Sequence, residues 1–277
     1  MKRRKKIRNR IILLLLGVLL LLCFLGIYVL FHSEKEEPVS EPEIVYYYNI
    51  DQFKKDENGL MTFTDPDYMY TTGIDVSQFQ HYIDWEQVAQ ENLDFVMIRA
   101  GYRGAIEGLL HTDEYYEHNI QGALDNNMKV GVYWYSTSLN TEELDEEIDY
   151  LLELIEPYDI SYPVVYDMEP YFQDENGGRI HVLSVQEKTD LANYFCDRLE
   201  EKGYKTMIYG NSDWLYNNLD FNQIRDREIW YAAYQSKPSM IDRFTMWQYS
   251  NRGIISGIDT DVDINIYIQK KEDKVDE

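Results

Sequence analysis

The chain has 277 residues, 44% of them hydrophobic and 14% aromatic, which suits one large globular domain and excludes intrinsic disorder. Its formal net charge of −24 argues against a nucleic-acid partner, because a strongly negative surface repels a phosphate backbone. Its two cysteines, Cys23 in an apolar run and Cys196 in a helical pattern, do not form a disulfide framework.

The first 32 residues predict a membrane anchor. Residues 1–10 are rich in Lys and Arg and contain no acid, and the uncharged run from 11 to 31 is dominated by Leu, Ile and Val. As a helix, a run of this length spans about 30 Å, the thickness of one hydrocarbon core. Because basic flanks stay inside the cell, we expect a cytoplasmic tail at 1–10, a single transmembrane helix at 11–32 and an extracellular remainder. A cleaved signal peptide is the alternative, which the long run and the lack of an A-x-A-like site disfavour.

Residues 33–71 are predicted to form an acidic extracellular linker. Their first part reads SEKEEPVSEPE, a charged stretch with prolines that cannot bury a core. The part from 44 to 71 is ambiguous, because its aromatic residues could pack on a domain whereas its acids and Gly59 indicate a loop. At the other end, residues 271–277 are predicted to be a charged tail.

Between residues 72 and 270 the pattern predicts one catalytic domain with eight strands. The apolar runs are 72–78, 95–102, 129–138, 162–170, 205–211, 229–235, 245–250 and 262–268. Helical patterns separate the early runs, at 85–92, 113–126, 142–156 and 185–202. The last of these begins with a capping box of Ser184 and Glu187 and ends at Gly203.

The spacing of these elements predicts the fold class. Alternation of strands and helices indicates parallel strands with crossover helices. The final strand-to-strand intervals, of about 16 residues, are too short for such a crossover and indicate loops or hairpins. We therefore expect an α/β fold, an irregular TIM-like (β/α) barrel with about five β/α units followed by three loop- or hairpin-connected strands.

Carboxylates recur at the ends of these strands, where barrels of this class carry their functional residues. Asp75 lies in the first run, Asp167 and Glu169 end the fourth, and Asp263 begins the eighth, with Asp261 as the competing position. Any one of the fifty acids could be an ordinary solvated side chain. The pair at 167 and 169 is different, because it ends a run that should be buried.

The pair of Asp167 and Glu169 predicts acid catalysis. Residues two apart on a strand face the same side, with α carbons about 6.6 Å apart. Like charges so close cannot both ionise cheaply, so one pKa rises and a proton donor becomes available near neutral pH. Such a donor can protonate a glycosidic oxygen. Because both acids share one side, we expect Glu169 to donate the proton and Asp167 to orient a 2-acetamido group of the substrate as nucleophile, with retention of configuration.

Five motifs occur together in residues 72–268: GIDVSQFQ with IDW, DFVMIRAGYRG, GVYWYS, PVVYDMEP, and MWQYS with GIDTDVDIN. Together they resemble the glycoside hydrolase family 25 lysozymes, the Chalaropsis-type muramidases. The resemblance implies hydrolysis of the β-1,4 bond between N-acetylmuramic acid and N-acetylglucosamine in peptidoglycan, without a metal or an organic cofactor. By motif position it implies Glu169 as the acid, Asp167 as its partner, and Asp75 and Asp263 as further site acids.

Residues late in the strand runs are candidate substrate contacts, since sugar-binding clefts use aromatic faces and hydroxyl groups. They are Arg99, Tyr102, Tyr133, Asn211, Tyr234, Trp247 and Gln248. Each aromatic residue among them could equally belong to the core. The chain departs from the family at Tyr133-Trp134-Tyr135, where a histidine between two aromatic residues is common. The five histidines lack metal-ligand spacing, so no metal site is expected.

We therefore expect the protein to be a membrane-anchored glycosidase that acts on peptidoglycan glycan strands. A cell-envelope machine is a further candidate partner. A non-catalytic cell-wall-binding or assembly module on the same fold is the alternative, because fold alone does not fix function. A chitinase-like glycosidase is a third possibility. Digestion of cell wall that is lost in Glu169→Gln would distinguish the glycosidase from the non-catalytic module. A comparison of hydrolysis rates on chitin and on peptidoglycan tests the chitinase-like alternative.

Overall fold

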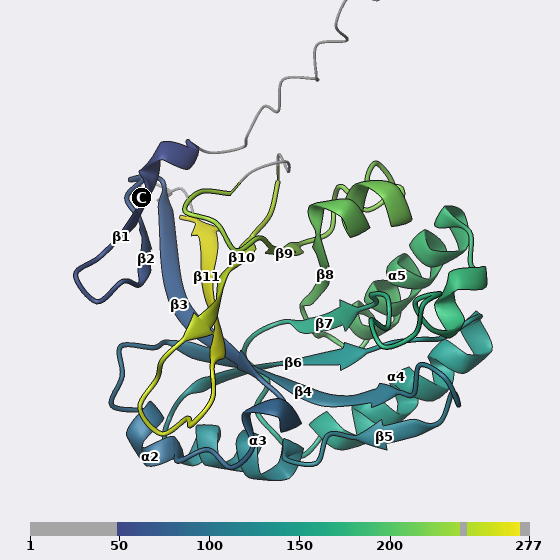
Figure 1. Ribbon diagram of the computed structural model, residues 1–277, viewed down its shortest axis with the longest axis horizontal. Coiled ribbons are helices and arrows are strands. Elements are labelled where there is room, and N and C mark those ends of the chain that lie inside the picture. The colour runs from purple at the N-terminus through teal and green to yellow at the C-terminus, as the bar shows by residue number, and fades with distance from the viewer. Residues whose placement is uncertain (1–48, 239–242, 272–277) are drawn as a thin grey trace, which may run out of the picture. The chain divides into compact units, whose positions relative to one another are not determined.

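Eight strands form a closed barrel in the computed structural model, which describes residues 49–238 and 243–271 (Figure 1). In barrel order they are β3 (Tyr68–Val76), β4 (Phe95–Arg103), β6 (Lys129–Tyr135), β7 (Val164–Asp167), β8 (Thr206–Asn211), β9 (Ile229–Ala232), β10 (Met246–Gly253) and β11 (Val262–Lys270). From β3 round to β10 neighbouring strands are parallel, whereas β11 runs antiparallel to both β10 and β3. The short β5 (Leu110–Thr112) pairs with the end of β4. Each predicted run is a strand, so the mixed α/β barrel is confirmed.

A helical segment follows each of the first five barrel strands, as predicted. These segments are α2 (Trp85–Val88), α3 (Tyr116–Asp125), α4 (Thr141–Ile155), α5 (Val185–Glu200) and the π-helical turn η4 (Trp214–Asn218). The longer three pack against β4, β6, β7 and β8 (Figure 1). Within the described residues no helix follows β9 or β10, so the irregular finish is also confirmed.

The first helix is shorter than the predicted 85–92. Its cap is as expected, since an Asp84 carboxylate oxygen accepts from the Gln87 backbone N–H at 3.2 Å. The chain then leaves the helix because Asp94 is tied to Thr72 at two points. The Thr72 N–H donates to the Asp94 carboxylate at 2.8 Å, and the Asp94 N–H donates to the Thr72 carbonyl at 2.7 Å. These bonds draw the chain back into β4 after a single helical turn.

Side chains along the strands alternate between the barrel interior and an outer core beneath the helices. On β4, Phe95 and Met97 belong to the interior cluster, whereas Val96 and Ile98 belong to the outer one. Interior positions on β7 and β10 are likewise taken by apolar residues, Val165 and Met246. Two residues further along each strand, the next inward position reaches the mouth of the barrel. This position is Arg99 on β4, Asp167 on β7 and Gln248 on β10.

Residues 49–71, which the sequence suggested were linker, are folded. After η1 (Ile50–Gln52), β1 (Phe53–Lys55) and β2 (Met61–Phe63) form an antiparallel hairpin with a buried apolar face. The Phe53 ring lies 5.2 Å from the Trp247 ring, and the Met61 N–H donates to the Tyr249 hydroxyl at 3.0 Å. The hairpin therefore covers β10, a strand that no helix follows in the described part of the chain. The linker prediction is therefore wrong for this segment, because alternating apolar residues give the acidic stretch a face to bury.

Several predicted segments lie outside the described residues. They are the cytoplasmic tail at 1–10, the transmembrane helix at 11–32, linker residues 33–48 and residues 272–277 of the charged tail. Among the helices in the described ranges, none has the length and apolarity needed to cross a bilayer.

Candidate active site

A cavity of about 660 Å³ lies at the carboxyl ends of the parallel strands. Every barrel strand supplies at least one residue to its wall: Asp75, Arg99, Tyr133, Asp167, Tyr209, Trp230, Gln248 and Asp263, from β3 round to β11. Glu169, directly beyond β7, lines it as well. The antiparallel β11 contributes its first residues, because its start lies where its neighbours end. The four acids predicted from the sequence therefore share one cavity.

Asp75 and Asp263 are paired neighbours on β3 and β11 and are held together by Gln248. The Gln248 Nε2 donates to Asp75 Oδ2 at 2.9 Å and to Asp263 Oδ2 at 3.1 Å. Its Oε1 accepts from the hydroxyl groups of Tyr209 and Tyr234, each at 3.0 Å. Because the two phenols fix the oxygen side of the amide, its nitrogen must face the carboxylates.

Asn265 gives Asp75 a second fixed donor. Its Nδ2 donates to Asp75 Oδ2 at 2.8 Å, while its Oδ1 accepts from the Trp230 indole N–H at 2.8 Å. Neither Asn265 nor Trp230 was among the residues predicted for the site. A signal for Asn265 was present, because it lies two residues after Asp263 on one strand and so faces the same side.

Asp167 and Glu169 lie on the same side of the strand end, as predicted. Met168 between them points into the outer core, where its sulfur lies 3.7 Å from the Tyr166 hydroxyl. The Tyr135 hydroxyl donates to the Glu169 backbone carbonyl at 3.2 Å and fixes the position of this residue beside β6. Asp167 is buried, and its Oδ1 has no hydrogen-bond partner within the described residues. The pair is thus positioned by the backbone, with a carboxylate whose hydrogen-bonding capacity is not filled.

Arg99 is the cationic side chain in the cavity wall. Its Nε donates to Asp113 Oδ2 at 2.8 Å, in an ion pair that is almost completely buried. Its guanidinium also lies over the rings of Phe79 and Tyr102, with centroid distances of 5.1 and 5.2 Å. These contacts hold one positive charge beside the four acids.

Burial raises the pKa of Asp75 and Asp263. The pKa of Asp75 rises to about 6, although the hydrogen bonds from Asn265 and Gln248 oppose the shift. The pKa of Asp263 rises to about 8, through burial and then through the charges of Asp75 and Glu169. Close as these acids are, no three His, Cys, Asp or Glu side chains in the described ranges are arranged to hold a metal ion.

Burial likewise raises the pKa of the Asp167 and Glu169 pair. The pKa of Glu169 rises to about 7. The pKa of Asp167 rises well above its usual range through burial and the charge of Glu169, while the charge of Arg99 opposes the shift. Since two such neighbours share protons, the pair retains one near neutral pH. The guanidinium of Arg99 lowers the pKa of Asp167 but is outweighed by burial, so the retained proton is shared between Asp167 and Glu169.

Four of the predicted substrate contacts line the cavity, and a fifth is hydrogen-bonded to one of them. Arg99, Tyr102, Tyr133 and Gln248 line it, and Tyr234 stands beside it with its hydroxyl bonded to Gln248. Tyr102 is also stacked on His111, with ring centroids 5.0 Å apart. Tyr135, Tyr209 and Trp230 line the same wall and were not predicted. For Tyr209 and Trp230 the strand alternation carried the signal, because they occupy inward positions on β8 and β9.

Trp247 and Asn211 do not line the cavity, so we withdraw them as substrate contacts. Trp247 lies one residue from the inward-facing Gln248, so alternation turns it into the outer core, where its indole N–H donates to the Ala233 carbonyl at 2.9 Å. The side chain of Asn211 is used by the turn that follows it, where its Oδ1 accepts from the Trp214 N–H at 2.9 Å. Both positions are explained by local geometry.

Asp263, not Asp261, is the last acid of the cavity. Asp261 is exposed and lies outside the cavity wall, and its backbone carbonyl accepts from Gln80 Nε2 at 3.4 Å. Asp263 shares Gln248 with Asp75 and faces the barrel interior. The sequence left open whether Asp261 or Asp263 belongs to the site, and Asp263 is the one that lies on the inward face of β11.

Comparisons with known proteins agree with this geometry. The sequence model of the family described as glycosyl hydrolases family 25 matches residues 74–258. The autolytic lysozyme of Clostridium acetobutylicum is 25% identical over 194 residues, which cover 70% of this chain and 54% of that protein. A family 25 glycosyl hydrolase structure from Bacillus anthracis matches with a TM-score of 0.59 and 25% identity, covering 74% of this chain and 91% of that one.

A modular autolysin structure from Streptococcus pneumoniae, in complex with a synthetic peptidoglycan ligand, shares the fold. It matches with a TM-score of 0.65 and 23% identity and covers 78% of this chain. The match spans 50% of the autolysin, so this chain corresponds to about half of that larger protein.

Proposed function

Because the chain belongs to the glycosyl hydrolases of family 25 and is a glycosidase, we propose that it cleaves the β-1,4 bond between N-acetylmuramic acid and N-acetylglucosamine in peptidoglycan. Peptidoglycan hydrolysis in general follows from the lysozymes among its relatives. The particular bond and the mechanism are our proposal. The observation that carries it is the convergence of Asp75, Asp167, Glu169 and Asp263 on one cavity, in which burial raises the pKa of Glu169 to about 7.

In the proposed reaction Glu169 donates its proton to the glycosidic oxygen as the bond to the anomeric carbon breaks. The carbonyl oxygen of the substrate's own 2-acetamido group attacks that carbon, and Asp167 orients the group and stabilises its positive charge. Water then opens the cyclic intermediate, with the Glu169 carboxylate as the base that takes the water proton. Asp75, whose pKa of about 6 leaves it mainly ionised at neutral pH, stabilises the positive charge that develops on the sugar ring.

Product analysis tests the bond and the mechanism together. We expect the full chain to release fragments with reducing N-acetylmuramic acid ends, in which the first product keeps the β configuration. Mass spectrometry of borohydride-reduced fragments identifies the end, and NMR during early hydrolysis identifies the anomer. Reducing N-acetylglucosamine ends would refute the proposed bond. An α anomer formed first would refute substrate assistance and indicate a water activated from β3 or β11.

The pH dependence of kcat/KM should follow the proton on Glu169. Because its pKa is raised to about 7, the donor is present below that pH and is lost above it. We expect kcat/KM to fall by about tenfold per pH unit on the alkaline side of this value. A pH–rate profile on purified wall, with circular dichroism at each pH as a folding control, checks this. Full activity maintained up to pH 9 would contradict the assignment of Glu169 as the acid.

We also propose that the enzyme is a single-pass membrane protein with its catalytic domain outside the cell. Support comes from the basic residues at 1–10 and the uncharged apolar run at 11–31. A tethered hydrolase could open the wall for a cell-envelope machine in the same membrane. Mass spectrometry of the mature protein tests the anchor, and an N-terminus after residue 32 would contradict it.

A further inference from the structure

Three large apolar side chains stand exposed in the wall of the catalytic cavity. Phe79, Ile106 and Phe172 line it, with exposed fractions of 64%, 62% and 81%. They come from three separate segments: η2 (Gln78–Gln80), the turn between β4 and β5, and the loop that follows β7. We refer to these three residues as the apolar rim. Exposed apolar groups gathered around one cavity are typical of a binding surface.

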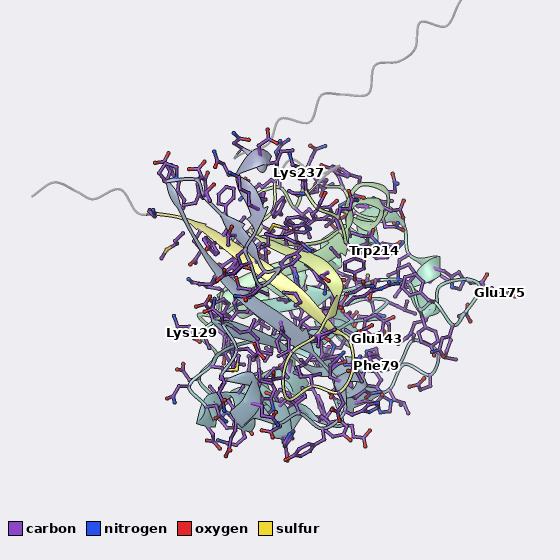
Figure 2. All side chains as sticks on the ribbon, turned by 60° about the vertical axis from the view of Figure 1, so that its left-hand side comes forward. Phe79, Lys129, Glu143, Glu175, Trp214 and Lys237 are labelled. Carbon is purple, nitrogen blue, oxygen red and sulfur yellow. The ribbon has the colours of Figure 1, made fainter. Side chains whose placement is uncertain are left out.

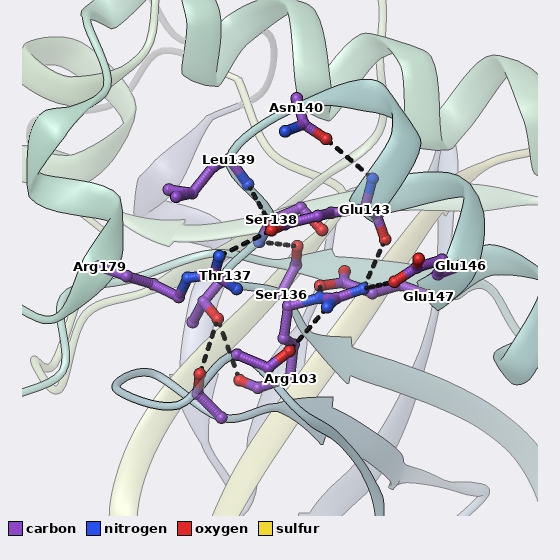
Figure 3. A network of polar contacts seen from close by, with 12 residues as sticks. Arg103, Ser136, Thr137, Ser138, Leu139, Asn140, Glu143, Glu146, Glu147 and Arg179 are labelled. Atoms are coloured by element: carbon purple, nitrogen blue, oxygen red, sulfur yellow. Dashed lines mark hydrogen bonds and ion pairs between the residues drawn. The ribbon is translucent and has the colours of Figure 1, made fainter.

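The loop that carries Phe172 is anchored to the turn that carries Ile106. The Arg179 N–H, at the end of the loop, donates to the Ala105 carbonyl at 2.9 Å. Its Nη2 donates to Glu143 Oε1 on α4 at 2.7 Å (Figure 3). The guanidinium lies against Gly108, where a β carbon would come within 2.4 Å of Nη1. Gly108 also has a φ of +73°, in the left-handed region that favours glycine, so the turn favours this residue here.

A second arginine anchors the same turn to α4. Arg103 donates through Nε to Glu147 Oε1 at 2.8 Å and through Nη1 to the Gly108 carbonyl at 2.7 Å. Its Nη2 donates to the Glu143 carbonyl at 2.8 Å, so Arg103 and Arg179 meet on one residue of α4 (Figure 3). Because Arg103 and Glu147 are buried, this network is shielded from competing water. The turn and the end of the loop are thus both held to α4.

Phe79 is fixed independently. It lies in a turn closed by a capping box of Ser77 and Gln80, and the neighbouring Gln78 N–H donates to Asp113 Oδ2 at 2.9 Å. Asp113 is the same residue that holds Arg99, whose guanidinium lies over the Phe79 ring. Figure 2 shows Phe79 far from Glu175, which stands at the outer tip of the loop after β7.

Polar groups suited to sugar hydroxyls lie beside Phe172. The Tyr171 hydroxyl donates to Gln173 Oε1 at 2.8 Å, and both residues line the cavity. This bond occupies the oxygen side of the Gln173 amide and leaves its nitrogen as a donor. An aromatic face flanked by a phenol and an amide matches a pyranose ring, which presents C–H groups on its face and hydroxyls on its edge.

We propose that the apolar rim binds sugar units of the glycan strand beyond the cleaved bond, so that the enzyme prefers long strands to short ones. The inference rests on the proposed glycosidase function. The rim is continuous with the cavity that holds Asp167 and Glu169, and the units on either side of a cleaved glycan bond are themselves sugars. A rim whose segments are held in place loses less entropy when the strand binds, so its contacts add to affinity.

Hydrolysis of peptide-free oligosaccharides of the N-acetylmuramic acid–N-acetylglucosamine repeat, from tetrasaccharide to octasaccharide, tests the proposal. In the full chain, Phe172→Ala should raise KM for the octasaccharide by about three- to tenfold without lowering kcat, as expected for the loss of one ring contact. The tetrasaccharide should be affected much less. Phe172→Tyr, which keeps the ring, should restore the wild-type KM. Ile254→Ala is the control, because Ile254 is 90% exposed and lies outside the cavity wall.

Three results with Phe172→Ala would overturn the proposal. The first is an equal rise in KM at every chain length, and the second is no rise in KM for the octasaccharide. The third is a rise in KM only for peptide-bearing strands, which would assign the rim to the stem peptide. Octasaccharide binding measured by calorimetry in Glu169→Gln separates this proposal from the proposed function. If wild-type protein cleaves nothing while Phe172→Ala still weakens binding in that background, the rim stands and the hydrolase assignment fails.

Discussion

Replacement of Glu169 by Gln should lower kcat for wall hydrolysis by about 10²- to 10⁴-fold, the usual contribution of a positioned general acid. The amide has nearly the same volume as the carboxylic acid but has no acidic proton to donate. Substrate affinity should change little, because the cavity wall and the apolar rim remain intact. The measurement is kcat and Kd with purified peptidoglycan, compared between the wild-type full chain and the variant.

Glu175→Gln is the matched control for this experiment. Glu175 is exposed at the tip of the same loop (Figure 2). It is not among the residues that line the cavity. It should retain wild-type activity. Activity of Glu169→Gln within threefold of the wild type would show that another group supplies the proton. Absence of turnover in the wild-type protein, with binding intact, would instead favour the non-catalytic wall-binding module.

Replacement of Asp167 by Asn should reduce kcat by about 10²- to 10³-fold and at the same time stabilise the fold. The loss of activity follows because a neutral amide cannot stabilise the positive charge of the cyclised acetamido group. The gain in stability follows because the pKa of Asp167 is raised by burial and then by the charge of Glu169, so the folded protein resists its ionisation. An increase of about 2–4 °C in Tm corresponds to about 1 kcal/mol in a domain of this size.

The size of the stability effect depends on pH. A carboxyl group whose pKa is higher in the folded than in the unfolded state makes the fold less stable as pH rises from the unfolded value, here 3.8, toward the folded one. Asn does not titrate, so the advantage of Asp167→Asn should be large at pH 8 and vanish near pH 3. Thermal unfolding at both pH values measures it, with the exposed Asp261→Asn as control. A Tm below wild type at pH 8 would show that the Asp167 carboxylate stabilises the fold.

The barrel could be predicted from sequence because its signals are local. Each strand is a short apolar run, and the helices over β4 to β8 carry periodic apolar faces and caps such as Ser184 with Glu187. The hairpin at 53–63 was harder to predict. Its strands have three residues each, and they are stable because Phe53 and Met61 contact Trp247 and Tyr249 nearly two hundred residues away. No local pattern contains that information.

The acids of the site were predictable and much of their surroundings was not. Asp167 and Glu169 are conspicuous because they end a buried run, whereas Tyr209 and Asn265 look like ordinary strand residues until alternation places them inside the barrel. Trp247 was misassigned because the prediction used its position in the strand and not the side of the strand to which its side chain points. Phe172 could not be predicted as part of the cavity, since its place depends on the contact of Arg179 with Ala105 and Glu143.

Burial raises the pKa of the Glu169 carboxyl group to about 7, so that it still holds a proton near neutral pH, and this pKa can be measured directly. The full chain, labelled with carbon-13 at the glutamate side-chain carboxyl groups, can be titrated by NMR beside Glu169→Gln to assign the resonance. We predict that the resonance missing from the variant titrates with a pKa of about 7. A value near 4.5, the ordinary pKa of glutamate, would mean that this group is already ionised at neutral pH and cannot be the proton donor.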